Sequence, residues 1–141
     1  MEKLLETARD ILIKNKYTCV LMSENEEYHS NLKGVKPLLD FLNSNKNFNG
    51  FYAADKIVGL GAAHLYVLLG VKSVWANVIS EPAFALLKNN SIGVFYKTKA
   101  PFIINREGND KCPIEKAVTG VENSKDALLV IKQTLENLRG K

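Results

Sequence analysis

Apolar and polar residues recur along the chain with two different periods, which together predict an ordered series of helices and strands. Near the N-terminus, apolar residues return every three or four positions, which indicates an amphipathic helix from about residue 2 to 15. Two β-rich runs follow, Tyr17 to Met22 and the more polar Glu26 to Asn31, and the turn-forming residues between them predict an antiparallel hairpin. A short helix is expected next over VKPLLDFLNSN, with Pro37 in its first turn.

Strands and helices alternate in the second half of the chain. A short strand is expected over 51–54, with Asp55 as the N-cap of a helix that runs to about Leu69 and ends at Gly70. The later elements are a strand over Val71 to Ile79, a helix capped by Ser80, strands over Ser91 to Tyr96 and Phe102 to Ile104, a short helix from Cys112, and a final helix from about Ser124 to Arg139. This alternation predicts the α/β class, a three-layer α/β/α sandwich whose mixed sheet has the hairpin as an antiparallel edge.

Composition narrows the class of protein further. A length of 141 residues is that of about one domain, so we expect a single domain over 1–141 with a C-terminal helical extension from about residue 105. The net charge of +4 is spread without any run of five or six like charges, so no nucleic-acid partner is expected. The apolar stretch from Ala62 to Val71 is too short for a membrane span, so no membrane association is expected either.

The N-terminal segment and the two cysteines bear on the compartment. The first sixteen residues are charged throughout, unlike a secretory signal, so a cytoplasmic location is expected. In a reducing compartment, Cys19 and Cys112 are expected to be free thiols.

Four short segments in the second half resemble a known family. They are A-D-K-I-V-G at 54–59, W-A-N-V-I-S-E-P-A at 75–83, I-I-N-R-E-G at 103–108 and C-P-I-E-K-A-V at 112–118. On these segments the chain resembles domain of unknown function 1893, a family of uncharacterised bacterial and archaeal proteins. The resemblance, together with the order of elements, implies a cytidine-deaminase-like fold. It implies no reaction, because the family has none assigned.

The residues that zinc deaminases need are missing from the expected positions. Such enzymes carry a His or Cys followed by Glu at one helix start and Pro-Cys-x-x-Cys at the next. Here the first helix start, at 34–37, and the second, at 55–59, hold no such ligands, and His29 and His64 have neither a neighbouring Glu nor a cysteine pair. Zinc deamination is therefore not expected, and no metal or other cofactor is predicted.

Cys112-Pro113-Ile114-Glu115 is the most informative short motif. Cys112 would be the N-cap, Pro113 the first helical residue, and Glu115 would reach back to the N-cap amide as in a capping box. A thiol at a helix N-terminus faces the positive end of the helix dipole, which favours the reactive thiolate. The alternative is that Pro113 and Glu115 simply start a helix and Cys112 is a small buried apolar residue.

Two further groups are candidates for ligand contacts. Asp55 and Lys56 are expected at the carboxyl end of a central strand, where ligands of open α/β sheets bind. Asn105 and Arg106 follow a short strand, and the Arg106 guanidinium suits a carboxylate or phosphate. The plainer alternatives are an N-cap, a solvated lysine and a surface turn.

The glycines at 59 and 61 do not match a dinucleotide-binding motif. His64 stands where the third glycine of such a motif is needed, and its side chain is too large for close contact between helix and strand. Small residues that let the helix pack tightly on the sheet are the better interpretation.

Three hypotheses for function follow. The first is a small-molecule enzyme or sensor with a pocket at the carboxyl ends of the strands: Cys112 is a nucleophile or redox thiol, Asp55 and Glu115 handle protons, and Lys56 and Arg106 clamp an anion, with Asn105 beside them. The second is a non-catalytic module that binds a small molecule in an ancestral deaminase-like pocket. The third is an assembly protein, a homo-oligomer among the options, that pairs through an edge strand at 91–96.

Overall fold

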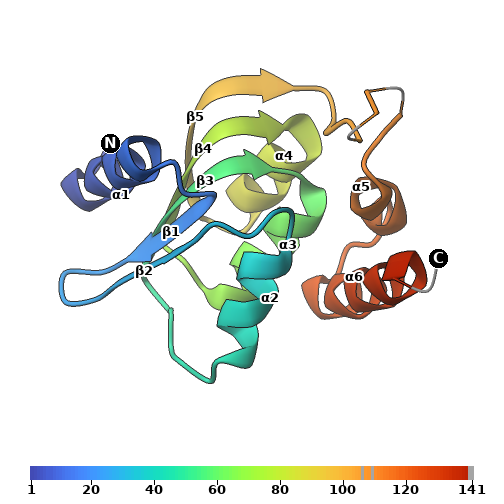
Figure 1. The fold of residues 1–141 in the computed structure, drawn as a ribbon, viewed down its shortest axis with the longest axis horizontal. Coiled ribbons are helices and arrows are strands. Elements are labelled where there is room, and N and C mark those ends of the chain that lie inside the picture. The colour runs from blue at the N-terminus through green and yellow to red at the C-terminus, as the bar shows by residue number, and fades with distance from the viewer. Residues whose placement is uncertain (106, 109, 140–141) are drawn as a thin grey trace.

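The computed structural model describes residues 1–105, 107–108 and 110–139, which form a twisted sheet with helices on both faces (Figure 1). In chain order the elements are α1 (Lys3–Asn15), β1 (Cys19–Met22), β2 (Glu27–Ser30), α2 (Lys36–Asn43), β3 (Tyr52–Val58), α3 (Leu60–Leu69), β4 (Ser73–Ser80), α4 (Glu81–Asn89), β5 (Gly93–Ala100), α5 (Pro113–Val118) and α6 (Ser124–Arg139). The strand order is β2-β1-β3-β4-β5; β1 runs antiparallel to both neighbours, and β3, β4 and β5 are parallel. The predicted α/β class, with a mixed sheet and an antiparallel hairpin at its edge, is confirmed.

Several element ends lie where local chemistry predicts them. Gly70 ends α3 in the left-handed region at φ 74°, a conformation that glycine adopts without a Cβ penalty. Ser80 is the N-cap of α4, and its Oγ accepts a hydrogen bond from the Ala83 amide at 3.2 Å. Pro37 and Pro82 both occupy a first helical turn, where a missing N–H breaks no bond.

The predicted helix start at Asp55 is wrong. β3 continues through Asp55 and Lys56 to Val58, and α3 begins only at Leu60, with Gly59 as its N-cap. Asp55 lies opposite Cys19 in β1 and Ala76 in β4, so its backbone belongs to the sheet on both sides. The N-cap preference of aspartate therefore yields to strand pairing at this position.

The last strand also differs from the prediction. β5 extends to Ala100, beyond the predicted end at Tyr96, because Val78, Ile79 and Ser80 of β4 continue to pair with it. The separate strand predicted over residues 102–104 is not formed: only Ile104 makes an isolated bridge, with Lys111.

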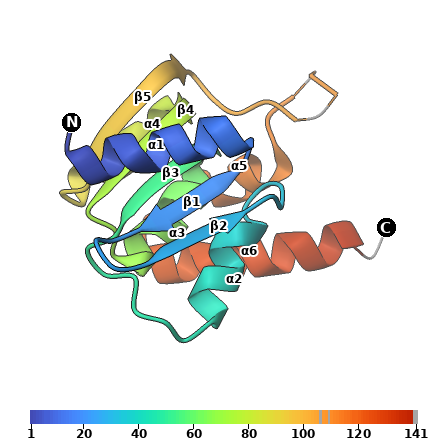
Figure 2. The ribbon, with the colours of Figure 1, turned by 60° about the vertical axis from the view of Figure 1, so that its left-hand side comes forward.

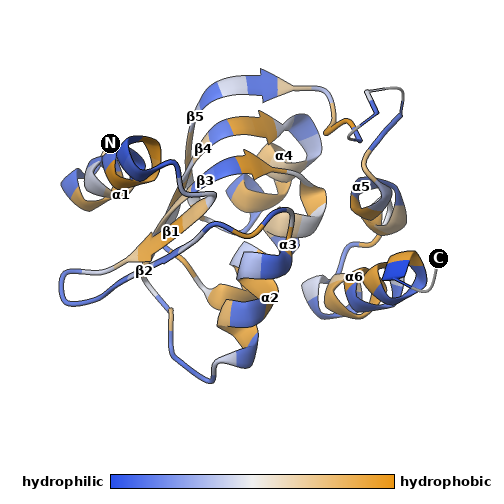
Figure 3. Ribbon diagram, viewed as in Figure 1, coloured by the Kyte–Doolittle hydropathy of each residue, from blue (hydrophilic) through white to orange (hydrophobic). Residues whose placement is uncertain are grey.

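One face of the sheet is covered by α1, which lies across the strands in Figure 2. The helix is amphipathic, with apolar and polar sides visible in Figure 3. Its buried residues pack against apolar side chains of β1, β3 and β4 in one cluster, formed by Leu5, Ala8, Leu12, Val20, Met22, Tyr52, Ala54 and Trp75. This cluster forms the first interface between layers.

The opposite face carries the larger core and most of the helices. α3 and α4 pack against it and against each other, α2 lies beside α3, and α5 and α6 pack on the outer side of α3 (Figures 1 and 2). α3 is buried nearly all round, as its apolar sequence LGAAHLYVLL requires. Within the part of the chain that the structure describes, no helix is both long and apolar enough to cross a membrane.

Candidate active site

Asp55, Tyr66 and Cys19 form a buried chain of polar side chains, with Tyr66 in the middle. The Tyr66 hydroxyl, on α3, donates a hydrogen bond to Asp55 Oδ2 at 2.6 Å, and the Ile57 amide donates to Oδ1 at 3.2 Å. On its other side, the Tyr66 hydroxyl lies 3.4 Å from Cys19 Sγ. Asp55 is 8% exposed, and both Tyr66 and Cys19 are essentially inaccessible. The three side chains therefore form one hydrogen-bonded line in which Tyr66 of α3 joins Asp55 of β3 to Cys19 of β1.

Burial determines how these groups titrate. Loss of hydration raises the pKa of Asp55 from 3.8 to about 7, although the hydrogen bonds from Tyr66 and the Ile57 amide act in the opposite direction. Burial likewise raises the pKa of Tyr66 and of the Cys19 thiol well above their ordinary values, and the nearby Asp55 charge adds to both. Asp55 is thus the member of the line that changes protonation near neutral pH.

Glu115 is a second buried carboxyl, brought to the same region by α5. Its Oε2 accepts a hydrogen bond from the Leu60 amide at 2.6 Å, so it caps the N-terminus of α3 from a distant part of the sequence. Its Oε1 is buried and has no hydrogen-bond partner among the described residues. Burial raises the pKa of Glu115, while the Leu60 amide and, more weakly, the Ser80 hydroxyl and the Gly61 amide favour its charged form. The predicted capping box is wrong: the amide of Cys112 donates instead to the carbonyl of Ile103.

Two glycines allow α5 to approach α3 this closely. A Cβ at Gly59 would lie 2.7 Å from Glu115 Oε2, and a Cβ at Gly61 would lie 2.5 Å from Ile114 Cγ2. Both separations are shorter than van der Waals contact, so a larger residue at either position would displace the Glu115 or the Ile114 side chain. The expectation that these small residues allow the helix to pack tightly on the sheet is wrong about the partner: the close neighbours of both glycines come from α5, α6 and Ile103.

Cys112 is the N-cap residue of α5, as predicted, and it is half-buried. Its thiol makes no capping hydrogen bond, and α5 has only six residues. Since a short helix has a weak dipole, the dipole gives less support to a thiolate than the sequence motif implied. The hypothesis of a functional thiol therefore rests on where Cys112 lies, in the lining of the cavity described below.

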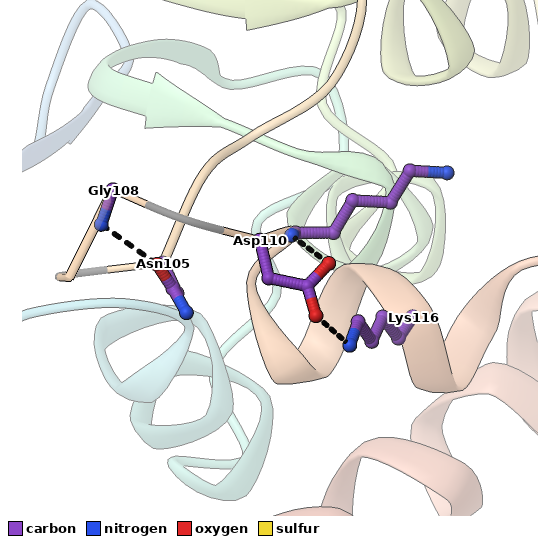
Figure 4. Close-up of polar contacts among 5 residues, drawn as sticks. Asn105, Gly108, Asp110 and Lys116 are labelled. Atoms are coloured by element: carbon purple, nitrogen blue, oxygen red, sulfur yellow. Dashed lines mark hydrogen bonds and ion pairs between the residues drawn. The ribbon is translucent and has the colours of Figure 1, made fainter.

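The turn between β5 and α5 holds the remaining predicted residues. Asn105 Oδ1 accepts a hydrogen bond from the Gly108 amide at 2.8 Å (Figure 4), so this oxygen is engaged within its own turn. Asp110 accepts from the Lys111 amide and pairs with Lys116 of α5, which ties the turn to the helix (Figure 4). Arg106 lies outside the described residues.

A cavity of about 650 Å³, partly open to solvent, lies where these groups meet. Its lining includes five of the six predicted site residues, Asp55, Lys56, Asn105, Cys112 and Glu115. Gly34 in the loop before α2 and Gly59, the N-cap of α3, also line it. Across the described residues, no three His, Cys, Asp or Glu side chains gather closely enough to hold a metal ion.

Sequence reasoning missed two side chains of this region and one backbone group. Tyr66 holds Asp55, Lys33 lines the cavity beside α2, and the Leu60 amide binds Glu115. A tyrosine in an otherwise apolar helix was a usable signal, because a buried hydroxyl needs a partner. Lys33 stands in a polar loop and gave no signal.

His64 is held against the start of α6, away from the cavity. It is fully buried, as expected of a core histidine, with Nδ1 2.9 Å from Ser124 Oγ. Its Nε2 has no hydrogen-bond partner in the described part of the chain, and burial lowers its pKa. The histidine does not line the cavity.

Comparison with known proteins identifies a family and similar solved structures. A family model described as "Domain of unknown function (DUF1893)" matches residues 7–135, which confirms the resemblance found in the sequence. The crystal structure of a DUF1893 family protein (TM1506) from Thermotoga maritima is similar with a TM-score of 0.85 and 28% identity, covering 97% of this chain and 92% of that one. No curated protein matches the chain.

Two deaminase structures show a weaker likeness. The dCMP deaminase from the cyanophage S-TIM5 has a TM-score of 0.47 at 12% identity, covering 68% of this chain and 99% of that one. A diaminohydroxyphosphoribosylaminopyrimidine deaminase/reductase from Thermotoga maritima has a TM-score of 0.45 at 10% identity, covering 67% of this chain and 35% of that one. At these values neither bears on the chemistry of this chain.

Proposed function

Since the chain belongs to the DUF1893 family, whose function is unknown, we propose a function from its geometry: a small-molecule enzyme or sensor whose ligand occupies the cavity. Asp55 and Glu115 are its proton-handling groups, and Cys112 is the thiol that faces the ligand. The ligand is held by Lys56 and Asn105. The two cysteines are free, which suits a reducing, cytoplasmic location.

The observation that supports this proposal is convergence. β3, the 105–112 turn and α5 are separated by up to 60 positions in the sequence, and each contributes a chemically capable side chain to one cavity. A carboxyl with a pKa of about 7 exists in both protonation states near neutral pH, so Asp55 can either accept or donate a proton. Perturbed carboxyls that line a cavity are a common mark of functional sites.

Thiol alkylation against pH tests the role of Cys112. Iodoacetamide labelling is followed by mass spectrometry between pH 6 and 10, with Cys112→Ser as the control. Cys19 serves as an internal standard, because its buried thiol is expected to stay unlabelled while the protein is folded. We expect Cys112 to be labelled in the folded protein at least as fast as free glutathione under the same conditions. Labelling slower than that of glutathione would remove the nucleophile from the proposal.

A non-catalytic binding module is the second candidate. The observation that favours it is that Cys112 Sγ makes no hydrogen bond with any residue that the structure describes, so no base is in contact with the thiol. This candidate predicts that a small molecule co-purifies with the protein and leaves unchanged. Native mass spectrometry of freshly purified protein would detect it; a clean mass of the chain alone would count against this candidate.

A further inference from the structure

Exposed apolar side chains gather at the rim of the cavity. Ile57, Ile104 and Leu138 all line it, and they are 49%, 52% and 45% exposed. They come from β3, from the turn between β5 and α5, and from the last turn of α6, so three segments distant in sequence each contribute one. Exposed apolar side chains that meet at one place are typical of a binding surface.

The lining deeper in the cavity is apolar as well, and it is buried. Val35, Ala62 and Ile114 are each less than a tenth exposed, and Gly61 beside them is also buried. The cavity therefore extends from an exposed apolar rim into the core. At about 650 Å³ it has the size that encloses a small organic molecule, which fills such a recess better than the flat surface of a partner protein does.

The charged side chains that line the cavity do not favour a charge of either sign. Lys33 and Glu107 are both exposed and carry opposite charges, so their effects on a ligand oppose each other. Glu115 is 5% exposed; its Oε1 is inaccessible, and its Oε2 binds the Leu60 amide. A molecule in the cavity therefore does not reach the Glu115 oxygens.

The side chain of Lys56 lies on the other face of the sheet. Ala54 packs in the α1 cluster and Asp55 bonds to Tyr66 of α3, so the alternation along β3 returns Lys56 to the α1 face. There it lines a smaller hollow beside Trp75, and it borders the large cavity with its backbone. Both oxygens of Asp55 already accept hydrogen bonds. Among the described residues, the lining thus offers a charged ligand no partner of opposite sign that is not offset.

We propose that the cavity binds an uncharged, mainly apolar small molecule, whose hydrocarbon body lies against Ile57, Ile104 and Leu138. The inference rests on the proposed function and names the class of its ligand. A charged group on the ligand would lose hydration on entry and gain no ion pair in return. The Cys112 thiol, also in the lining, is a polar neighbour that suits a hydroxyl or carbonyl group on the ligand.

Three probes with one cyclohexane body test the charge preference: cyclohexylmethanol is neutral, cyclohexylmethylamine is a cation and cyclohexanecarboxylate is an anion. Binding to the full chain is measured by ¹H–¹⁵N NMR titration at pH 6, below the pKa of about 7 of Asp55, so that this carboxyl attracts no cation. Shifts are expected at the amides of Gly61, Ala62 and Asn105. We expect the alcohol to bind at least about tenfold more tightly than either ion.

A second series measures the contribution of apolar contact. 1-Butanol, 1-pentanol and 1-hexanol carry the same hydroxyl group on chains of increasing length. Each added methylene group that is buried against the aliphatic walls is expected to tighten binding about fourfold. The same NMR titration measures the three affinities.

Two leucines of α6 provide a matched pair of variants. Leu138 lines the cavity, whereas Leu129, which is 65% exposed, does not. Leu138→Ser and Leu129→Ser both replace an exposed side chain, so both proteins are expected to unfold at the urea concentration of the wild type. Only Leu138→Ser is expected to weaken the binding of 1-hexanol, by about threefold to tenfold. Ile57→Thr, on β3, is a second variant for which the same loss is expected.

The results that overturn the inference are distinct from those that overturn the proposed function. Binding of either ion as tight as that of the alcohol, no gain along the alcohol series, or equal losses in Leu138→Ser and Leu129→Ser would refute an uncharged apolar ligand while leaving the cavity a ligand site. Shifts at the same amides on raising the protein concentration without a probe would also refute it, because a second copy of the chain would then cover the rim. Absence of binding by every probe would refute it too, and the proposed function would then rest on the labelling of Cys112.

Discussion

The two faces of the sheet bury different chemistry. The face under α1 holds an apolar cluster around Leu5 and Trp75. The face under α3 buries every acid and histidine that is buried within the described ranges: Asp55, His64 and Glu115. Ala54 and Asp55 are neighbours on β3, yet the first joins the α1 cluster and the second bonds to Tyr66 of α3.

This difference shows where stability and chemistry are located. Apolar burial stabilises by removing surface from water, and it tolerates no charge unless that charge is compensated. Asp55 and Glu115 are held in place by hydrogen bonds from Tyr66 and the Leu60 amide, yet burial still raises the pKa of both. Burial of these two carboxyls therefore destabilises the α3 face beside the cavity. Among the described residues, the α1 face buries no acid and has no such cost.

The largest expected effect is on the apolar face. Leu5→Ala removes a fully buried side chain from the α1 cluster and is expected to lower the free energy of unfolding by about 2–5 kcal/mol. Urea denaturation measures this, and a ¹³C NMR titration of Asp55 is expected to be unchanged. A shifted Asp55 titration would mean that the two faces are coupled through the sheet.

Asp55→Asn is expected to have the opposite sign above neutral pH. A folded-state pKa of about 7 against an ordinary 3.8 means that the native carboxyl retains its proton as pH rises, so the stability it contributes is present below about pH 4 and lost through pH 7. Removing the charge is expected to raise the free energy of unfolding at pH 8 by about 1–3 kcal/mol relative to wild type. Thermal unfolding at pH 5 and pH 8 measures this, and a variant equally stable at both relative to wild type would contradict it.

Gly61→Ala tests the close contact between α3 and α5. Alanine in a helix normally stabilises relative to glycine, but here its Cβ would lie 2.5 Å from Ile114 Cγ2, so a net loss of about 1–2 kcal/mol is expected. In an Ile114→Ala background, which removes that methyl group, the same substitution is expected to be neutral or stabilising. A double-mutant cycle by urea denaturation compares the two, and equal effects in both backgrounds would show that the helices do not meet there.

Tyr66→Phe has the smallest expected effect on stability, about 1 kcal/mol, because it removes the hydroxyl that bonds to Asp55 and contacts the Cys19 thiol but keeps the ring. Its main effect is on titration. The Tyr66 hydroxyl favours the charged form of Asp55, so its loss is expected to move the pKa of Asp55 above 7. A ¹³C carboxyl titration reads this directly. An unchanged or lower pKa would show that the hydroxyl does not support the carboxylate.

Local signals predicted most of the fold. Gly70, Ser80 and Pro37 mark helix ends through chemistry that lies within a few residues, and each marks the end it was expected to mark. The family resemblance was visible for the same reason, since it rests on short contiguous segments. Asp55 was misassigned because its partners, Cys19, Tyr66 and Ala76, are distant in sequence, and aspartate followed by lysine looks like a helix start.

The sequence predicted which residues line the candidate site better than it predicted the hydrogen bonds that these residues make. Asp55, Lys56 and Cys112 were chosen for their residue types and expected positions, and all three line the cavity. Nothing in the sequence connects Glu115 with the Leu60 amide, because a carboxylate can satisfy any nearby donor and the local capping box is the nearest one. Hydrogen-bond partners that are distant in sequence depend on how the helices pack against one another. The periodicity of apolar residues predicts the helices but not this packing.

The bond from the Leu60 amide to Glu115 joins groups 55 positions apart. During synthesis, the sheet from β1 to β5 leaves the ribosome before α5 does. Until α5 follows, the Leu60 amide at the start of α3 lacks the Glu115 carboxylate. The floor of the cavity is therefore completed only when α5 has emerged and docked. A nascent chain that stops short of α5 has a scaffold with an open, uncapped helix, and ligand recognition is among the last properties that the growing polypeptide acquires.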